Sequence, residues 1–414
     1  MEAIVERCGG LDVHQATVVA CVLVGAANQK ARKEVRTFGT YTQDLVALRD
    51  WLASEGCTHV AMESTGIYWM PVYRVLEGHF ELVVGNAERI RNVPGRKTDV
   101  KDAEWIANLL RHGLIPRSFV PPKPIRELRD LMRYRRSLVE ARSAERNRLL
   151  RLLESANIKL ATVASNVFGI SGTLMVRALI DGHATPDEMA RLAKGRLRSK
   201  MPLLPAALDG RLEDHHRELL AMQLGRLDRL ETEIAELERR IQQRLDPYAS
   251  QMASLSEIPG IDWTIAATIV SEVGVDMESF ASAAKLACWA GLSPGNHESA
   301  GHRKREHTGK GNKYLKTALV QAAHAAARQR GSYFKAKFFA LRGRMGPKKA
   351  VVAVAHKILI AAYHVLKTGV AYKDLGEGYL DTRSSARVAS QLMRRLKRLG
   401  FTPPSAPLPK MRKD

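Results

Sequence analysis

Short apolar runs, rich in β-branched residues, open the chain and predict β-strands. The first three of these runs are residues 3–13, 16–24 and 33–40. Only two residues separate the first pair, so we expect these two strands to form a hairpin. An amphipathic helix is predicted next, over residues 42–56, with Thr42 as its N-cap and Gly56 at its end.

Strand and helix patterns alternate after this helix. Strands are predicted over residues 59–65 and 80–86, and helices over residues 66–78 and 98–110. Antiparallel strands followed by strand–helix crossovers indicate a mixed sheet with helices on its faces, in which the first and fourth strands can be neighbours. We therefore expect residues 1–120 to form an α/β domain, bounded by the stiff sequence PPKP that begins at Pro121.

Long helical patterns dominate residues 121–248. Nine arginines lie between Arg126 and Arg151, more than one face of a compact core would hold. A less regular stretch separates this helix from a second one, whose apolar heptad positions are Leu220, Leu227, Ile234 and Ile241, with Leu230 and Leu237 between them. About three heptads lie at the lower limit for a coiled coil. Two interpretations stay open: a helical hairpin within one chain, and a dimerisation arm.

A mainly helical globular domain is predicted over residues 249–375. The sequence IPGID, at 258–262, precedes an amphipathic helix and is typical of a helix–hairpin–helix element, whose turn amides can hold a phosphate. A tight αα corner is the alternative, and Asp262 stands where such hairpins usually have glycine. The long apolar stretch 350–369 contains His356 and Lys357, which favours a buried helix over a membrane span.

The end of the chain, residues 376–414, is basic and contains prolines. This composition predicts a fraying tail that contacts phosphates. The whole chain has the same bias: 414 residues carry 65 Lys+Arg against 43 Asp+Glu, a formal net charge of +22. Such an excess has no bearing on the fold, but it predicts attraction to polyanions, of which nucleic acid is the commonest.

The cysteines and the N-terminal sequence bear on the cellular compartment. None of the four cysteines lies in a CxxC pair or at zinc-ligand spacing from a histidine, so we expect reduced thiols in a cytosolic protein. The first residues include acids and lack a long apolar run, so no signal peptide is expected.

Two acids three residues apart, Asp99 and Asp102, stand among cations in the helix predicted after the last strand. With Thr98 as N-cap and Gly113 at the end, both acids share one helix face. They lie beside an apolar stripe that would pack on the sheet. Acids in a first turn also suit the helix dipole, which contributes roughly 0.3–1 kcal/mol, so their position alone does not demand chemistry.

Two further acids have apolar neighbours: Asp12, which follows two glycines within the first predicted strand, and Glu63, which ends the fourth. A carboxylate in such surroundings needs a partner to offset its desolvation. If the first and fourth strands are neighbours, their ends bring these acids together, with Asp99 and Asp102 close by. Four carboxylates cannot all stay ionised in a small volume without cations, and Mg²⁺ prefers oxygen ligands. The cations expected to hold a nucleic-acid backbone beside them are Arg96, Lys97 and Lys101.

A glycine-rich basic loop in the C-terminal domain carries Ser299 in the sequence ESAG. The cations expected to contact phosphates there are Arg303, Lys304, Arg305, Lys310 and Lys313. The loop is either a flexible phosphate-contacting segment or the site of a serine nucleophile. Composition does not separate the two, because a serine needs activation by its surroundings.

Four segments together resemble a known family: GLDVHQATVVACVL, AMESTGIYWMPVY, VPGRKTDVKDAEWIANLLRHGLI and IPGIDWTIAATIVSEVG. They are similar to the DEDD-type transposases of bacterial insertion sequences (insertion-sequence family one-hundred-ten), and the resemblance spans residues 4–370. The element order and the acid placement also resemble the ribonuclease-H-like fold of the RuvC-type junction resolvases. The resemblance implies a RuvC-like mixed sheet domain, a long helical coiled-coil segment, and a mainly helical domain that bears the serine.

By this resemblance, Asp12, Glu63, Asp99 and Asp102 form the DEDD tetrad and bind Mg²⁺. A serine of the second domain forms a covalent link to DNA, and the match assigns it to Ser299, with Ser293 as the competitor. The implied partners are donor and target DNA and a structured guide RNA encoded by the same element. We also expect a homo-oligomer, a dimer or tetramer, without membrane attachment, associated with the nucleoid in a bacterial cytoplasm.

Two alternatives to a transposase remain. One is a junction-resolving nuclease that uses the acids and Mg²⁺ with water as the nucleophile. The other is a catalytically dead nucleic-acid-binding protein.

Overall fold

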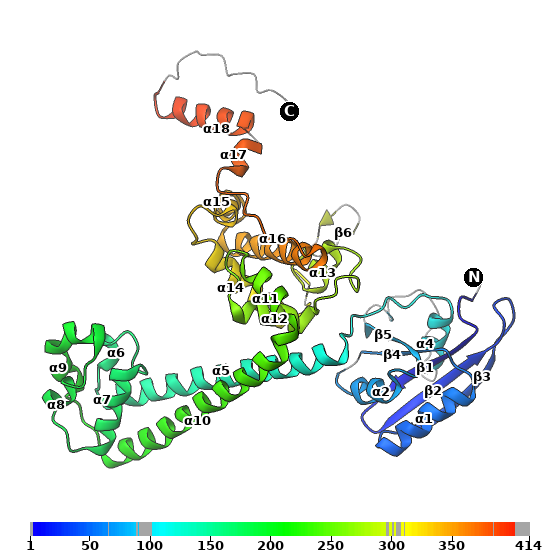
Figure 1. Cartoon of the computed structure of the whole chain (residues 1–414), viewed down its shortest axis with the longest axis horizontal. Coiled ribbons are helices and arrows are strands. Elements are labelled where there is room, and N and C mark those ends of the chain that lie inside the picture. The colour runs from blue at the N-terminus through cyan, green and yellow to red at the C-terminus, as the bar shows by residue number, and fades with distance from the viewer. Residues whose placement is uncertain are drawn as a thin grey trace. The chain divides into compact units, whose positions relative to one another are not determined.

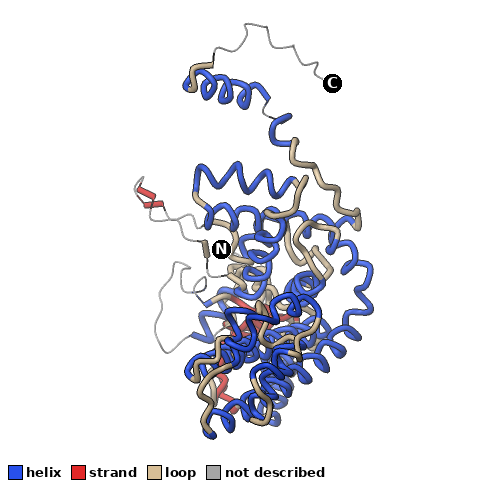
Figure 2. The backbone as a smooth tube through the Cα atoms, turned by 90° about the vertical axis from the view of Figure 1, so that its left-hand side faces the viewer, coloured by secondary structure: helices blue, strands red, loops and turns tan. Residues whose placement is uncertain are grey.

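The computed structural model describes residues 3–64, 66–87, 90, 102–294, 298–299, 302–303, 308–309, 311–383 and 385–401. The chain divides into two compact units, residues 1–120 and 121–414. In Figure 2 helix makes up most of the described residues, and the strands among them belong to the sheet of the first unit and one short hairpin in the second.

The first unit is built on a mixed five-stranded sheet (Figure 1). Its strands are β1 (Arg7–Val13), β2 (Thr17–Val24), β3 (Arg32–Gly39), β4 (His59–Glu63) and β5 (Glu81–Gly85). The strand order is β3-β2-β1-β4-β5, antiparallel among the first three and parallel across β1, β4 and β5. The predicted mixed sheet is confirmed.

Helices cover both faces of this sheet because the strand residues alternate between two apolar clusters. The helices are α1 (Thr42–Ser54), α2 (Trp69–Leu76) and α4 (Asp102–Arg111). Leu11 of β1 and Met62 of β4 pack with α1 and α2 on one face. Cys8 and Ala61 pack with α4 on the other. The predicted apolar stripe of α4 is buried, as Ile106 and Ala107 illustrate.

One predicted helix start was wrong by a residue. Thr42 is the first residue of α1, and Tyr41 occupies the N-cap position without a side-chain cap. The threonine has the right chemistry for a cap. The backbone instead becomes helical one residue earlier than expected: Tyr41 is extended, and its carbonyl accepts from the amides of Asp44 and Leu45.

The second unit contains an antiparallel pair of long helices, α5 (Lys123–Ser155) and α10 (Asp214–Leu245), drawn side by side in Figure 1. The apolar heptad positions of α10 are all buried within this one chain: Leu220, Leu227, Leu230, Ile234, Leu237 and Ile241. Ion pairs link the two helices, including Arg135 to Glu238 and Arg146 to Glu231. The seam is therefore that of a hairpin within one chain, and a dimerisation arm that uses the same seam is wrong.

The stretch between these helices was expected to be less regular, yet it folds. It contains α6 (Leu160–Val163), α7 (Ile170–Asp181), α8 (Pro186–Ala190), the 3₁₀ helix η1 (Gly195–Leu203) and α9 (Leu204–Leu208). Their apolar residues share one core with the adjoining ends of α5 and α10. Each helix is too short for its periodicity to stand out in the sequence, and packing stabilises them together.

The rest of the unit is a helical domain. After η2 (Asp246–Tyr248) come α11 (Ala249–Ser256), α12 (Trp263–Val273), α13 (Ala283–Trp289), α14 (Lys313–Ala326), α15 (Tyr333–Met345), α16 (Pro347–Thr368), α17 (Tyr379–Arg383) and α18 (Ser385–Arg398). A short hairpin, β6 (Glu298–Ser299) with β7 (His302–Arg303), lies between α13 and α14. The expected fraying tail was wrong in part, because α18 is helical.

Helix α16 is long and apolar enough to cross a membrane by length and composition, alone in this among the described helices. Half of the qualifying window is buried inside the protein, where α16 packs against α13, α14 and α15. Val354, Ile358 and Ala362 on this helix are fully buried. This packing supports the interpretation of α16 as a core helix.

Two residues of the αα corner between α11 and α12, Gly260 and Asp262, are explained by helix packing and helix capping. Gly260 has a φ of +89°, and a Cβ built on it would lie 2.2 Å from the Ala322 carbonyl oxygen of α14. Asp262 is the N-cap of α12 and accepts a hydrogen bond from the Ile265 amide at 2.8 Å. The glycine permits close helix packing and the aspartate caps a helix, which favours the corner over a phosphate site.

The buried seam leads to a first prediction. Leu227→Asp and Ile234→Asp should each lower the free energy of unfolding by about 3–5 kcal/mol, because each places a carboxylate at a position that is buried within the single chain. Urea unfolding followed by circular dichroism measures the effect. The control is Ala235→Asp at the neighbouring exposed position, with an expected change below about 1 kcal/mol. A reduced sedimenting mass with unchanged unfolding would instead place the seam between subunits.

Candidate active site

Asp12 and Glu63 lie side by side at the carboxyl ends of two parallel strands. The register pairs Gly10 with Ala61 and Leu11 with Met62, so Asp12 and Glu63 follow directly on the two strands. Alternation places both acids on the face that α4 covers, opposite to the face of Leu11 and Met62. Both side chains are half-buried. Ligands of α/β sheets commonly bind outside the carboxyl ends of parallel strands.

Helix α4 rests directly on β1 at Gly10. A Cβ built on Gly10 would lie 2.3 Å from both the Ala103 carbonyl oxygen and the Ala107 amide nitrogen, so only glycine permits this approach. The Cys8 thiol donates to the Ala107 carbonyl oxygen at 3.6 Å. Further along, the Val5 amide donates to the Arg111 carbonyl at 3.1 Å. The helix therefore runs antiparallel to β1, with its first turn toward the Asp12 end.

Asp102 is the first residue of α4 and so lies toward Asp12 and Glu63. Its Oδ1 atom is buried. Burial of a carboxylate oxygen is costly unless positive charge compensates it. The donors that these three elements offer are all carboxylate oxygens, which suits a hard divalent cation such as Mg²⁺. The chemistry of these donors thus fits such an ion, but the ligand atoms of Asp12, Glu63 and Asp102 do not all lie within 4.8 Å of one another in the described structure.

His14 is a neighbour of Asp12 that the sequence analysis missed. Its Nε2 atom lies 3.1 Å from Asp12 Oδ2, and its side chain is 60% exposed. The signal was present in the strand pattern, because residues i and i+2 of an extended chain share a face. The tautomer decides whether the imidazole donates to the carboxylate.

Several predicted site residues lie outside the described residues. They are Asp99, Arg96, Lys97, Lys101, Lys304, Arg305 and Lys310. Ser299 and Arg303 are described only by their backbone, in the short β6–β7 hairpin, where Ser299 pairs with His302. Lys313 begins α14, and its ammonium group lies 5.1 Å from the centre of the Tyr314 ring. The competing Ser293 is half-buried beside Pro294, which pairs with Thr308.

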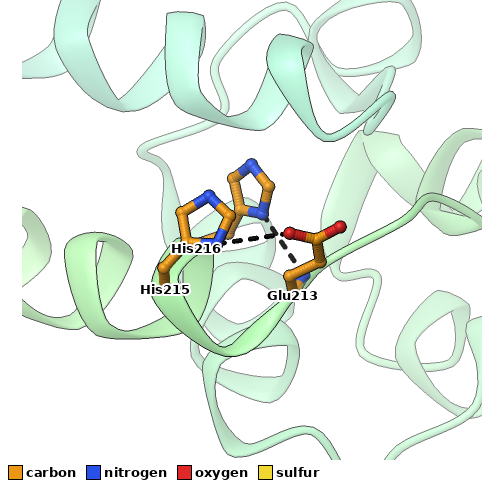
Figure 3. Close-up of side chains that lie close together, drawn as sticks. All are labelled: Glu213, His215 and His216. Carbon is orange, nitrogen blue, oxygen red and sulfur yellow. Dashed lines mark hydrogen bonds and ion pairs between the residues drawn. The ribbon is translucent and has the colours of Figure 1, made fainter.

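Among the described residues, the group of donor atoms close enough to share one ion is Glu213, His215 and His216, at the start of α10 (Figure 3). Their ligand atoms lie within 4.8 Å of one another. The Glu213 amide donates to His216 Nδ1 at 3.2 Å, and His215 Nδ1 lies 3.4 Å from the Glu213 carboxylate. Both interactions close the first turn of the helix, so capping explains this group without a metal.

Many arginines of α5 pair with acids of the same chain. At least six of the nine form ion pairs: Arg129 and Arg133 with Glu272, Arg135 with Glu238, Arg136 with Glu140, Arg146 with Glu231 and Arg148 with Glu145. Burial lowers the pKa of Arg129 to about 10, so it is still protonated at neutral pH. Four of these arginines link α5 to α12 or α10, whereas the pairs of Arg136 and Arg148 lie within α5. The arginine content of α5 is therefore explained in part by contacts within the protein.

Comparison with known proteins identifies the family. Residues 9–158 match the family model of DEDD transposases of the IS110 type, described as "Transposase". Residues 252–338 match a second model, described as "Transposase IS116/IS110/IS902 family". The first match spans the sheet, α4 and α5, and the second spans α11, α12 and the serine loop. The chain belongs to the IS110 family of transposases.

The individual relatives are below 30% identical to this chain, and each match covers only part of both sequences. The 42 kDa protein of insertion element IS900 from Mycobacterium paratuberculosis is 28% identical over 259 residues, 54% of this chain and 63% of the relative. A Sinorhizobium fredii protein named as a transposase, y4pF/y4sB, is 29% identical over 197 residues, 46% of this chain and 50% of the relative. The chain thus spans between half and two thirds of the length of these curated relatives.

The contact at Gly10 leads to a second prediction. Gly10→Ala should lower the free energy of unfolding by about 3 kcal/mol, because the added methyl group meets rigid helix backbone. Gly9→Ala is the matched control, since its methyl group meets side chains and no backbone: the end of Leu52 at 3.0 Å and Val60 at 3.6 Å. Thermal unfolding of the two variants measures the difference. Equal losses in the two would show that α4 does not rest on Gly10.

Proposed function

We propose that this protein is a DNA transposase that cuts and rejoins strands with a divalent metal centre and a serine nucleophile. The observation that carries the proposal is the convergence of Asp12, Glu63 and the start of α4 at one end of the sheet. Membership of the IS110 family supports it. The net charge of +22 suits a polyanionic substrate.

Asp12, Glu63, Asp99 and Asp102 would hold the metal. When bound, Mg²⁺ supplies stabilisation of the negative charge that develops on phosphoryl oxygens. The protein's part is to keep three or four carboxylates at the end of the sheet and to place cations around the substrate backbone. His14 is placed to hold the Asp12 carboxylate in one orientation through its Nε2 contact.

Ser299 is the proposed nucleophile. Its Oγ forms a bond to phosphorus while the bond from phosphorus to the leaving strand oxygen breaks. The hydroxyl proton leaves the serine, and the leaving oxygen takes up a proton. The phosphoserine ester conserves the bond energy, so a new strand hydroxyl can reverse the step and rejoin DNA. Serine needs activation for this, because its free hydroxyl is a weak nucleophile.

The acids and the serine belong to different units of the chain. We propose that the active site is completed when both units meet at one phosphate, and that the two can come from neighbouring subunits. Recombination joins two DNA partners, so we expect at least a dimer of active sites. A guide RNA encoded by the element would choose the sequence by base pairing, and the protein would then mainly contact backbone.

The third prediction concerns the acids. Asp12→Asn or Asp102→Asn should lower the rate of strand cleavage in Mg²⁺ by about 10²-fold or more, with thermal stability equal or higher, because clustered carboxylates repel without metal. Asp50→Asn is the control, since this acid lies on α1 with a side chain 61% exposed. Cleavage of a labelled DNA substrate measures the rate. Near wild-type cutting by both variants would exclude a carboxylate centre.

The fourth prediction concerns the nucleophile. A suicide DNA substrate should trap a protein–DNA adduct that Ser299→Ala lacks and Ser293→Ala keeps. Mixing Asp12→Ala chains with Ser299→Ala chains should restore activity if subunits share sites. Peptide mapping of the adduct identifies the residue. An adduct on Ser293 or on a tyrosine would remove Ser299 from the mechanism, and Mg²⁺-dependent cutting without any adduct would favour a nuclease that uses water.

A further inference from the structure

Glu272 is a buried carboxylate that the carboxylate centre does not use. It lies on α12, and only 1% of its side chain is exposed. Arg133 of α5 donates to both of its oxygens, each at 2.8 Å. Arg129 approaches the same carboxylate at 3.3 Å and also donates to the Ser271 carbonyl oxygen. Two arginines of the long helix are thus tied to one acid of the helical domain.

The third partner of Glu272 is Asn312, which stands where the serine loop returns to α14. Asn312 Nδ2 donates to Glu272 Oε2 at 2.6 Å. Its Oδ1 atom accepts from the amides of Tyr314 and Leu315, each at 3.0 Å, and so caps α14. The two contacts use opposite ends of one side-chain amide, which fixes its orientation. Glu272 therefore holds the residue at which the loop becomes helix.

The two stems of the serine loop meet at this point. Gly291 ends the segment after α13, and Gly311 precedes Asn312. A Cβ built on Gly311 would lie 2.3 Å from the Gly291 backbone nitrogen, so the stems touch through backbone alone. The Asn312 amide also donates to the Trp289 carbonyl oxygen at 3.3 Å. Fixing Asn312 thus fixes both ends of the segment that carries Ser299.

Tyr314 adds a second contact between α5 and this point. The guanidinium of Arg133 lies 4.4 Å from the centre of the Tyr314 ring, and that of Arg136 lies 5.2 Å from it. Arg133 therefore contacts both Glu272 and the first turn of α14. Helix α5 begins at Lys123, directly after the carboxylate unit ends at Val120.

We propose that Glu272 is a positioning residue for strand cleavage: through Asn312 it holds the base of the serine loop in a fixed position relative to α5. The inference rests on the proposed function of Ser299. A buried ion pair is a poor source of net stability, because desolvation offsets most of its attraction. A fully hydrogen-bonded buried network does confine its members to one arrangement. In this network the confined residue is Asn312, at the stem of the loop.

The test separates capping from positioning with two substitutions at one residue. Asn312→Ser retains an oxygen that can cap α14 but loses the amide that donates to Glu272. Asn312→Ala loses both. Ser282→Ala is the matched control: it removes the cap of α13, whose Ser282 hydroxyl accepts from the Lys285 amide, without touching Glu272. Adduct formation, DNA affinity and melting temperature are measured on the full-length chain.

Positioning predicts that Asn312→Ser and Asn312→Ala both slow adduct formation at Ser299 by tenfold or more, with DNA affinity unchanged. Ser282→Ala should keep the wild-type rate although its melting temperature falls as much as that of Asn312→Ser. A purely structural role predicts that Asn312→Ser reacts like the wild type. That result would overturn the proposal.

Hydrogen exchange gives a readout that does not require the chemistry. The amides of Gly311 and Asn312 should exchange at least tenfold faster in Asn312→Ser than in the wild type, and in Ser282→Ala they should not. If the wild type forms no adduct at Ser299, the proposed nucleophile fails, while the exchange data still decide whether Glu272 holds the loop base. Unchanged exchange in Asn312→Ser would overturn the proposal that Glu272 holds the base of the loop through Asn312.

Discussion

The backbone of α4 touches the backbone of β1 at Gly10, and the placement of the acids follows from that contact. A side chain at residue 10 would push the helix outward and move Asp102 away from Asp12 and Glu63. The parallel pairing of β1 with β4 sets the other half of the arrangement, because it brings two strand ends to one edge. A local property of the sequence, one glycine in a strand, therefore determines the geometry of a centre built from residues far apart in the chain.

Charge has two uses in this protein. Buried or half-buried arginines of α5 pair with acids of α10 and α12 and so act as links between helices. Cations without such partners are left to attract a polyanion. In the 3₁₀ helix η1, Lys200 donates to the Val163 carbonyl and Arg198 to the Ala193 carbonyl, and both residues are exposed. The net charge of +22 is thus not a measure of how many cations contact phosphate.

The sequence was most informative where periodicity and burial coincide. Alternating β-branched runs predicted the mixed sheet, and the apolar stripe around Ile106 predicted the inner face of α4. The heptads of α10 predicted that one face of this helix packs against another helix. They did not predict which helix, because the same pattern is found whether the partner helix belongs to the same chain or to another. The pairing of Glu272 with Arg133 and Asn312 was not predictable, since it joins residues that neither spacing nor pattern connects. The contact of His14 with Asp12 was predictable, because residues i and i+2 of an extended chain share a face.

Iron-directed cleavage of the protein tests the carboxylate centre most directly. Fe²⁺ in place of Mg²⁺, with ascorbate and peroxide, generates hydroxyl radicals that cut the backbone near the bound ion. The account predicts cuts near Asp12, near Glu63 and at the start of α4, all suppressed by excess Mg²⁺. Cuts confined to Glu213–His216, or no discrete cuts at all, would contradict a metal centre at the end of the sheet.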